Sequence, residues 1–580
     1  MIEAGWRFHP ASHCKPAMTA IPPAIDSAPR RIGKPRHPWV LAIAALVCAL
    51  VLLPVGTLAW IALTGSGADW PHLSRNVVPR AVIVTTQLVL AVSAGTAVLG
   101  VLTAWLVVAF EFPGRRLLSW ALVLPLAVPP YLAAYAFGEF FLFTGPVQTF
   151  YRSLFGFASA RDYWFPDVRS TGGAALVLVM VLYPYVYLTT RVVFLMQGRN
   201  IADVARTLGA GPLRVFLRVL LPVSRPAVVA GLALVLMETI NDIGAAEYLG
   251  VRTMTSAIFT TWINRSSLEG AAQIAMLMML FVVFLLALEQ WGRRNQRFHN
   301  VRATQVAARP PRVRLSIGGQ ALALGIIGVP IALGFGVPVY VFGGYAMRRL
   351  DYLLNADLFR ALTNTIVTAS ATAVLTVLLA LLLINATRLS RSGWTFAAVR
   401  IGSLGYALPG TIIGLGLLFA LARFDNGLDA AMRDWFGVST GLLLTGSATA
   451  VILACSIRFL ALAEGSVRAG LDKLPASLDQ AARSLGRSPM NSALFIILPL
   501  LRPAILTAAV LVFVDTVKEL SATILLRPFG FNTLATLVYE NASRAVVEDG
   551  SVAALLIIVT ALVPVMLLSR ALMRDGEANL

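Results

Sequence analysis

The sequence predicts an all-α polytopic membrane protein with about 12 transmembrane helices in two parallel six-helix repeats. Three observations lead to this class: the apolar composition, the number of long apolar segments and an internal repeat. Of the 580 residues, 58% are hydrophobic and 13% are charged, whereas average soluble domains carry about 25% charged residues. A soluble core cannot bury so much apolar surface, so the composition excludes a soluble enzyme.

Twelve apolar segments are long enough to cross a bilayer, which takes about 20 residues each. The first is too long and too far from the N-terminus to be a cleaved signal peptide. In the first half of the chain we expect spans at residues 38–64, 82–110, 117–143, 173–195, 227–250 and 271–291. In the second half we expect them at residues 315–343, 361–384, 397–421, 441–463, 504–527 and 552–572.

The distribution of charge predicts the orientation in the membrane. The chain carries 47 Lys and Arg against 28 Asp and Glu, a net charge of +19. With a cytoplasmic N-terminus, the segments on that side sum to +20 and the external segments to +2. This is the positive-inside pattern, so we expect both termini in the cytoplasm. The basic excess then marks contact with the lipid bilayer, and we expect no nucleic-acid partner.

Four parts of the chain follow from these patterns. Residues 1–37 form a cytoplasmic tail without apolar periodicity, which we interpret as disordered. Residues 38–292 form a first membrane domain, and residues 315–573 form a second one. Between them, residues 293–314 carry seven arginines and no acid. We interpret this segment as a solvated basic linker near anionic lipid rather than as an RNA-binding segment.

The two halves repeat one segment at a constant spacing. Residues 205–226 read ARTLGAGPLRVFLRVLLPVSRP, and residues 482–503 read ARSLGRSPMNSALFIILPLLRP. Their matching Gly and Pro positions are all 277 residues apart, as in Gly209 and Gly486. Both halves have six expected spans, so the repeats are parallel.

Each copy of this segment predicts a helix, a glycine turn, a short helix and then a Leu-Pro break before the next span. Gly209 and Gly486 permit a left-handed turn or a close backbone approach, and Pro212 and Pro489 suit the first turn of a new helix. A short helix across the cytoplasmic face is suited to docking a partner. The alternative is a plain re-entry loop, which would not require the same breaks in both copies.

The repeated segment resembles the EAA loop of permease subunits in ABC importers: E-A-A, three residues, G, nine residues, I, one residue, L-P. All spacings match in both copies, with Asp203 and Gln480 at the Glu position and Val204 and Val219 as further departures. The resemblance implies the type I importer permease fold in each half and assigns the coupling role to Asp203, Ala205, Gly209, Pro212, Pro222, Gln480, Ala482, Gly486, Pro489 and Pro499.

In this family the loop carries a coupling helix that sits in a groove of the ATPase subunit. The chain contains no G-x-x-x-x-G-K-[ST] phosphate loop, so we expect a transport subunit and not an enzyme. The resemblance implies two copies of a separate cytoplasmic ATPase as partners. ATP and Mg would bind there, and we expect this chain to bind no cofactor.

Polar residues recur in the helix after each loop. Carboxylates at mid-membrane cost about 2.5–3.5 kcal/mol by insertion scales, and residues four apart share a helix face. We therefore predict two facing polar stripes that line a central pathway, formed by Glu238, Asn241, Asp242, Asp515, Lys518 and Glu519. Lys518 would neutralise one acid, and Glu139 would face the same cavity. The alternative is interior hydrogen bonding or a helix break.

The sequence around these stripes is similar to the fused permeases of ferric iron importers, in ETINDIGAAEYLGV of the first half and VKELSATILLRPFGFNTLATLVYENAS of the second. The similarity implies Fe(III), delivered by a periplasmic binding protein across the bacterial inner membrane by alternating access. Carboxylates are hard ligands that suit Fe(III), although we assign no metal ligands. Fused permeases for thiamine, phosphonates or polyamines share the loops and the length, so these solutes stay open.

Two other classes compete with this interpretation. An ion-coupled secondary transporter would use the acids in its spans as proton sites, but the EAA spacing in both halves argues against it. The sequence also contains no motif of a membrane-embedded enzyme, because neither a His-rich metal set nor a Ser/His/Asp arrangement is present. For an importer, the binding protein would dock on the external loops, mainly residues 144–172, 250–271, 423–440 and 528–551.

Overall fold

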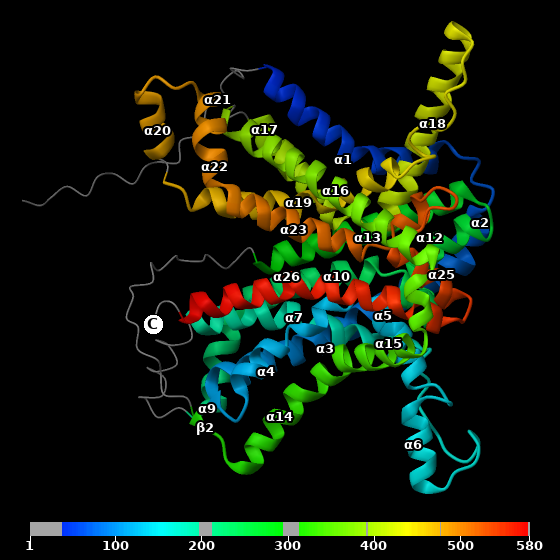
Figure 1. The fold of residues 1–580 in the computed structure, drawn as a ribbon, viewed down its shortest axis with the longest axis vertical. Helices are drawn as coiled ribbons and strands as arrows, with labels where there is room; N and C mark the ends of the chain where they lie inside the picture. Colours follow the sequence, from blue (N-terminus) through cyan, green and yellow to red (C-terminus); the bar gives the residue numbers. More distant parts are fainter. Residues whose placement is uncertain (1–37, 197–210, 294–312, 390–392, 476, 578–580) are drawn as a thin grey trace, which may run out of the picture.

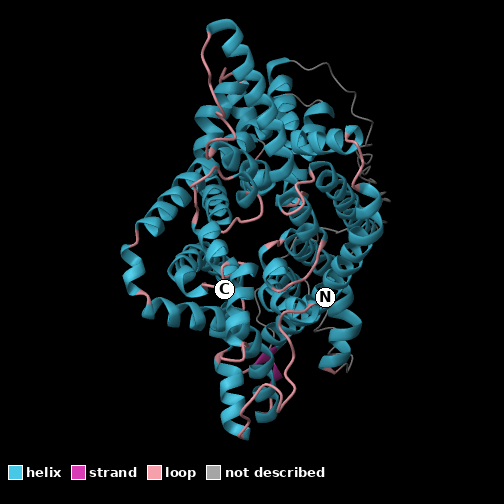
Figure 2. Cartoon of the chain, turned by 90° about the vertical axis from the view of Figure 1, so that its right-hand side faces the viewer, coloured by secondary structure: helices cyan, strands magenta, loops and turns pink. Residues whose placement is uncertain are grey.

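The computed structural model describes residues 38–196, 211–293, 313–389, 393–475 and 477–577. These residues are almost entirely helical, as Figure 2 shows. Ten helical stretches are long and apolar enough to cross a membrane, or twelve if each of two bent helix pairs forms one span. The predicted fold class, an all-α polytopic membrane protein with about twelve spans, is confirmed.

The first half contains α1 (Pro38–Thr64), α2 (Trp70–His72), η1 (Leu73–Val77), α3 (Val78–Ala109), β1 (Phe110–Glu111), α4 (Arg115–Ala121), η2 (Leu124–Ala127), α5 (Pro130–Phe140), α6 (Pro146–Phe155), α7 (Thr171–Met196), α9 (Pro212–Val215), η3 (Phe216–Leu220), α10 (Leu221–Asn241), α11 (Gly244–Tyr248), α12 (Met254–Ile263) and α13 (Leu268–Arg293).

The second half contains β2 (Val313–Arg314), α14 (Ile317–Ile331), η4 (Ala332–Gly336), α15 (Val337–Arg348), η5 (Leu350–Leu354), α16 (Ala356–Leu389), α17 (Gly393–Ser403), η6 (Leu404–Ala407), α18 (Gly410–Phe436), α19 (Thr449–Asp472), α20 (Ser477–Ser484), α21 (Pro489–Ser492), η7 (Ala493–Ile497), α22 (Leu498–Leu500), α23 (Arg502–Val517), α24 (Thr523–Leu526), α25 (Leu534–Ser543), η8 (Val547–Gly550) and α26 (Ser551–Glu577). In the described chain the only sheet is the parallel pair of β1 and β2.

The sequence repeat is also a structural repeat. Thr253 and Thr533 cap α12 and α25 by accepting the N–H three residues ahead. The next backbone N–H in each copy donates to a threonine of the long helix, Met254 to Thr85 at 2.9 Å and Leu534 to Thr365 at 2.8 Å. The matching residues are 280 positions apart in both helices, compared with 277 in the repeated loops, so the segments between these elements differ in length between the two copies.

The two halves exchange their first long helices. Helix α1 packs against α16, α17 and α18 of the second half, and α14 and α15 pack against α3, α4, α5 and α7 of the first, while α1 also contacts α13 and α15 also contacts α26 of their own halves (Figure 1). Glycines make the contacts close: a side chain on Gly416 would collide with the backbone of Pro54, and one on Gly334 with the carbonyl of Met180. The predicted boundaries 38–292 and 315–573 therefore separate the two repeats in the sequence. In space the two repeats are not separate domains, because helices of each pack against the other.

Four of the expected continuous spans are broken, which corrects the sequence prediction. The expected span 117–143 bends by 97° between η2 and α5. Val128 is extended there because the following Pro129 disfavours helical backbone. The span 397–421 breaks in the same way before Pro409. The spans 227–250 and 504–527 end at Asn241 and Val517.

The spans run between two ends of the molecule. Helices α9, α20 and α21 lie at one end together with β2, and α6, α12 and α25 lie at the other (Figure 1). The helices of the two repeated loops therefore share one end, as a docking role requires. The four helix breaks lie between the two ends.

Candidate substrate pathway and coupling loops

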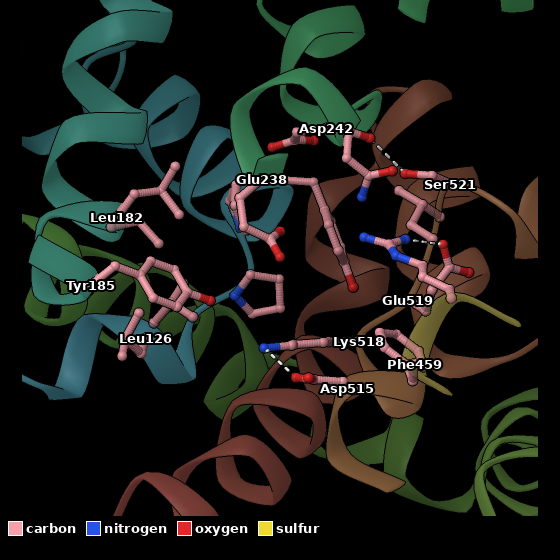
Figure 3. A pocket seen from close by; sticks show the side chains of 18 residues that line it. Leu126, Leu182, Tyr185, Glu238, Asp242, Phe459, Asp515, Lys518, Glu519 and Ser521 are labelled. Carbon is pink, nitrogen blue, oxygen red and sulfur yellow. Dashed lines mark hydrogen bonds and ion pairs between the residues drawn. The ribbon is translucent and has the colours of Figure 1, made fainter. Parts of the chain in front are cut away.

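A cavity of about 70 Å³ lies where the breaks of the two halves meet. Its walls come from α5, α7 and α10 of the first half and from α19 and α23 of the second (Figure 3). All six residues predicted for the pathway line it: Glu238, Asn241, Asp242, Asp515, Lys518 and Glu519. The fold thus brings together residues that are 277 positions apart, and their role in transport stays a prediction.

The acids of the second half carry their own counter-charges. Nη1 of Arg458 lies 2.9 Å from Oε1 of Glu519, and both side chains are nearly buried. Glu519 also accepts hydrogen bonds from the backbone N–H groups of Ala522 and Thr523 and from the Thr523 hydroxyl. Nζ of Lys518 lies 2.8 Å from Oδ1 of Asp515, which confirms that Lys518 neutralises one acid.

The acids of the first half lack such partners. Oδ1 of Asp242 accepts the N–H of Ala245 at 3.0 Å, whereas its Oδ2 has no hydrogen-bond partner among the described residues. Within the same part of the chain, neither Glu238 nor Asp242 pairs with a basic side chain. The close ion pairs of the cavity thus lie on the second-half wall, while Glu238 and Asp242 of the first half interact with Arg458 only at longer range.

The predicted helical stripes are wrong, although their members meet. Asp242 follows the end of α10 with extended backbone, and Glu519 follows the end of α23. Each carboxylate instead accepts the N–H three residues ahead, in Ala245 and Ala522. Asp and Glu side chains that bond nearby backbone compete with the helix. The alternatives to a pathway lining are interior hydrogen bonding and a helix break, and a helix break is present at this place in both halves.

Asn241 connects the two halves beside the cavity. Its Oδ1 accepts the backbone N–H of Gly410 at 2.6 Å, and its carbonyl accepts the Ser521 hydroxyl at 2.8 Å. A Cβ on Gly410 would lie 2.9 Å from Nη1 of Arg458 and 3.2 Å from Oδ1 of Asn241. Glycine therefore permits this close approach of α18 to the end of α10.

Sequence reasoning missed several residues of the cavity and misplaced one. Arg458, Tyr131, Tyr185 and Ser521 line it, and the one available signal was a basic residue, Arg458, inside an expected span. Glu139 does not line the cavity. Its Oε2 instead accepts the hydroxyl of Tyr345 at 2.8 Å, on α15, so the expectation that Glu139 faces the cavity is wrong.

The first coupling loop is described only in part. Asp203, Ala205 and Gly209 lie outside the described residues. Pro212 is the first residue of α9, and Pro222 lies in the first turn of α10. Between them, η3 is a π-helical turn in which the N–H of Leu221 bonds the carbonyl of Phe216.

The second coupling loop has the predicted order of helix, turn and short helix. Gln480 and Ala482 lie in α20, and Gly486 then turns with a left-handed φ of 77°. Pro489 begins α21, and η7 and Pro499 follow. The expected Leu-Pro break occurs only in this copy, as a bend of 70° before α23, whereas the first copy continues from Pro212 to Asn241.

The fold and the site define a multi-pass helical membrane protein with two repeated halves and a polar cavity between them. A family model described as "Binding-protein-dependent transport system inner membrane component" matches residues 96–291 and again residues 384–575. The chain belongs to this family and contains its domain twice.

Several relatives are similar to the chain. The Fe(3+)-transport system permease protein FbpB 2 of Haemophilus influenzae is 26% identical over 492 residues, 84% of this chain and 88% of the relative. The putative ferric transport system permease protein FbpB 1 of the same organism is 23% identical over 70% of this chain and 63% of its own length. A probable sulfate transport system permease protein cysT of Nephroselmis olivacea is 27% identical over 48% of this chain and 98% of its own length.

The chain is therefore a multi-pass inner-membrane permease of a binding-protein-dependent ABC importer. It is a transport component and not the ATPase. This assignment replaces the alternatives of an ion-coupled secondary transporter and a membrane-embedded enzyme.

Proposed function

We propose that this permease carries Fe(III), delivered by a periplasmic binding protein, into the cytoplasm. The two relatives named for ferric transport align with 84% and 70% of the chain. The sulfate relative aligns with 48%, and the molybdenum transport system permease protein ModB of Escherichia coli with 34%. The fused two-domain arrangement thus favours the ferric relatives.

The observation that carries the proposal is the charge of the cavity. Four carboxylates line it against two basic side chains, Arg458 and Lys518, and both bases are engaged by acids of the second half. A cavity with more acids than bases attracts cations and repels anions such as sulfate or molybdate. Carboxylate oxygens are also the hard ligands that Fe(III) prefers.

The coupling loops complete the proposed mechanism. One copy of a cytoplasmic ATPase subunit docks under each loop, with ATP and Mg bound on those subunits, and both termini lie on the same side. The loaded binding protein docks on the external loops at the end of α12 and α25. Closure of the ATPase dimer draws the two loops together, opens the cavity outward and separates contacts such as that of Asn241 with Gly410.

Uptake measurements test the substrate. The permease, its ATPase and its binding protein are expressed in cells that lack their own ferric importer, and uptake of radioactive iron, sulfate and molybdate is compared. We expect iron uptake that depends on all three components, with no sulfate or molybdate uptake. An ATPase unable to hydrolyse ATP is the control. Accumulation of either anion in place of iron would overturn the proposal.

A further inference from the structure

We propose that the first half supplies a transient coordination site for a hard trivalent cation, formed by Tyr131, Glu238 and Asp242, while the acids of the second half are self-neutralised. The inference rests on the proposed ferric function and assigns its binding residues. The two repeats have acids at matching positions, but in this proposal only those of the first half bind the ion.

The first observation is a pair of buried oxygens without partners. The side chain of Tyr131 is 4% exposed and lines the cavity, and among the described residues its hydroxyl has no hydrogen-bond partner. Oδ2 of Asp242, on the same cavity, also has none there. Buried polar atoms are nearly always paired, and an unpaired one indicates a missing water or ion. Two such oxygens border one small cavity, where an ion or an ordered water would supply the partner that both lack.

The second observation is the divergence of the repeats at this place. The counterpart of Asp242 is Glu519, which is held by Arg458 and three donors of its own segment. Tyr131 is the second residue after Pro129, and the corresponding position after Pro409 is Thr411. The first half therefore presents a phenol and a carboxylate oxygen without a partner. The second half presents a short hydroxyl, which also has no hydrogen-bond partner among the described residues, and a closed ion pair.

The third observation concerns how strongly such a site would bind. The described residues contain no group of three or more His, Cys, Asp or Glu placed to hold a metal ion. A phenolate and carboxylates are hard oxygen ligands, and the cavity of about 70 Å³ has room for an ion and some water. A site with few protein ligands binds an ion weakly. Weak binding suits a transport pathway, because the ion must also leave the site.

Binding to the isolated permease tests this assignment. The full-length chain in lipid nanodiscs is titrated with Fe(III) supplied as citrate, and visible absorption is recorded. Fe(III) bound to a phenolate gives a charge-transfer band, and the phenol releases its proton on binding. We expect this band in the wild type and its loss in Tyr131→Phe. We expect Asp242→Asn and Glu238→Gln to weaken binding by at least about 10–100-fold, the loss known for second-shell partners.

Glu139 and Tyr345 provide matched controls, because they are also a carboxylate and a phenol but lie away from the cavity and are hydrogen-bonded to each other. Glu139→Gln and Tyr345→Phe should leave both the band and the affinity unchanged. If Tyr131→Phe keeps the band, or if the control variants weaken binding as much as Asp242→Asn, the site assignment is wrong.

Iron uptake by the same variants separates the two proposals. If the wild type imports iron and all three cavity variants import it equally well, the coordination site fails while the ferric function stands. If the wild type imports no iron, the ferric function itself fails.

Discussion

Arg458 gives the cavity its asymmetry. The sequence identifies a basic residue inside a span, but its partner lies 61 residues further along the chain, past the end of α23. Spacing along a helix cannot predict that contact, because it depends on how α19 and α23 pack. The six predicted cavity residues could be found because polar residues inside apolar segments stand out, whereas Tyr131 is inconspicuous among other aromatic residues.

Removal of Arg458 should destabilise the protein. In Arg458→Met the nearly buried Glu519 loses its cation, and breaking a buried pair on one side typically costs about 3–5 kcal/mol. Thermal unfolding of the purified full-length chain in detergent measures the effect. The double variant Arg458→Met with Glu519→Gln should recover most of the loss. A single variant as stable as the wild type would show that the pair has no structural role.

At the level of elements, the fold was predictable where helices are continuous and not where they break. Composition and periodicity give the positions of the spans, and the Gly-Pro spacing gives the second coupling loop in the correct order. The break before Pro129 follows from the rule that a residue preceding proline disfavours helical backbone. The continuous apolar pattern of residues 117–143 nevertheless predicts one unbroken span. The ends of α10 and α23 were missed because Asp242 and Glu519 accept nearby backbone N–H groups, which a helical stripe does not anticipate.

The contact between α10 and α18 should hold the pathway closed. Asn241→Leu removes the acceptor for the Gly410 N–H, and a hydrogen bond contributes about 0.5–1.5 kcal/mol net. If this contact separates on opening, ATP hydrolysis by the reconstituted complex without binding protein should rise about two- to tenfold. Ser521→Ala, which removes the second contact of Asn241, should act in the same direction. Unchanged basal hydrolysis in both variants would contradict the role of this contact.

The turn at Gly486 should be needed for coupling. An L-residue in the left-handed region costs about 1–2 kcal/mol, so Gly486→Ala should distort the loop although its Cβ has free space. We expect ATP hydrolysis to continue with less transport per ATP. Gly465→Ala is a matched control, because that glycine in α19 also has free space but no positive φ. Equal coupling in both variants would show that α20 and α21 are not the coupling helices.

At the level of the whole molecule, the duplication could be predicted and the exchange of first helices could not. Identical spacing in two halves gives two similar units, but it does not say on which unit α1 or α14 packs. That choice depends on close backbone contacts at Gly334 and Gly416, whose partners lie in the other half. The exchange ties the two halves together through α1, α14 and α15.

In the proposed function, Fe(III) crosses the membrane through the cavity between the halves. The most direct measurement is ATP-dependent iron uptake into proteoliposomes that contain the complete complex, for the wild type and for Glu238→Ala with Asp242→Ala. We expect a loss of at least about tenfold in the double variant, as for lost metal-site groups, with assembly of the ATPase unchanged and normal uptake in Glu139→Gln. Wild-type uptake by the double variant would contradict this proposal.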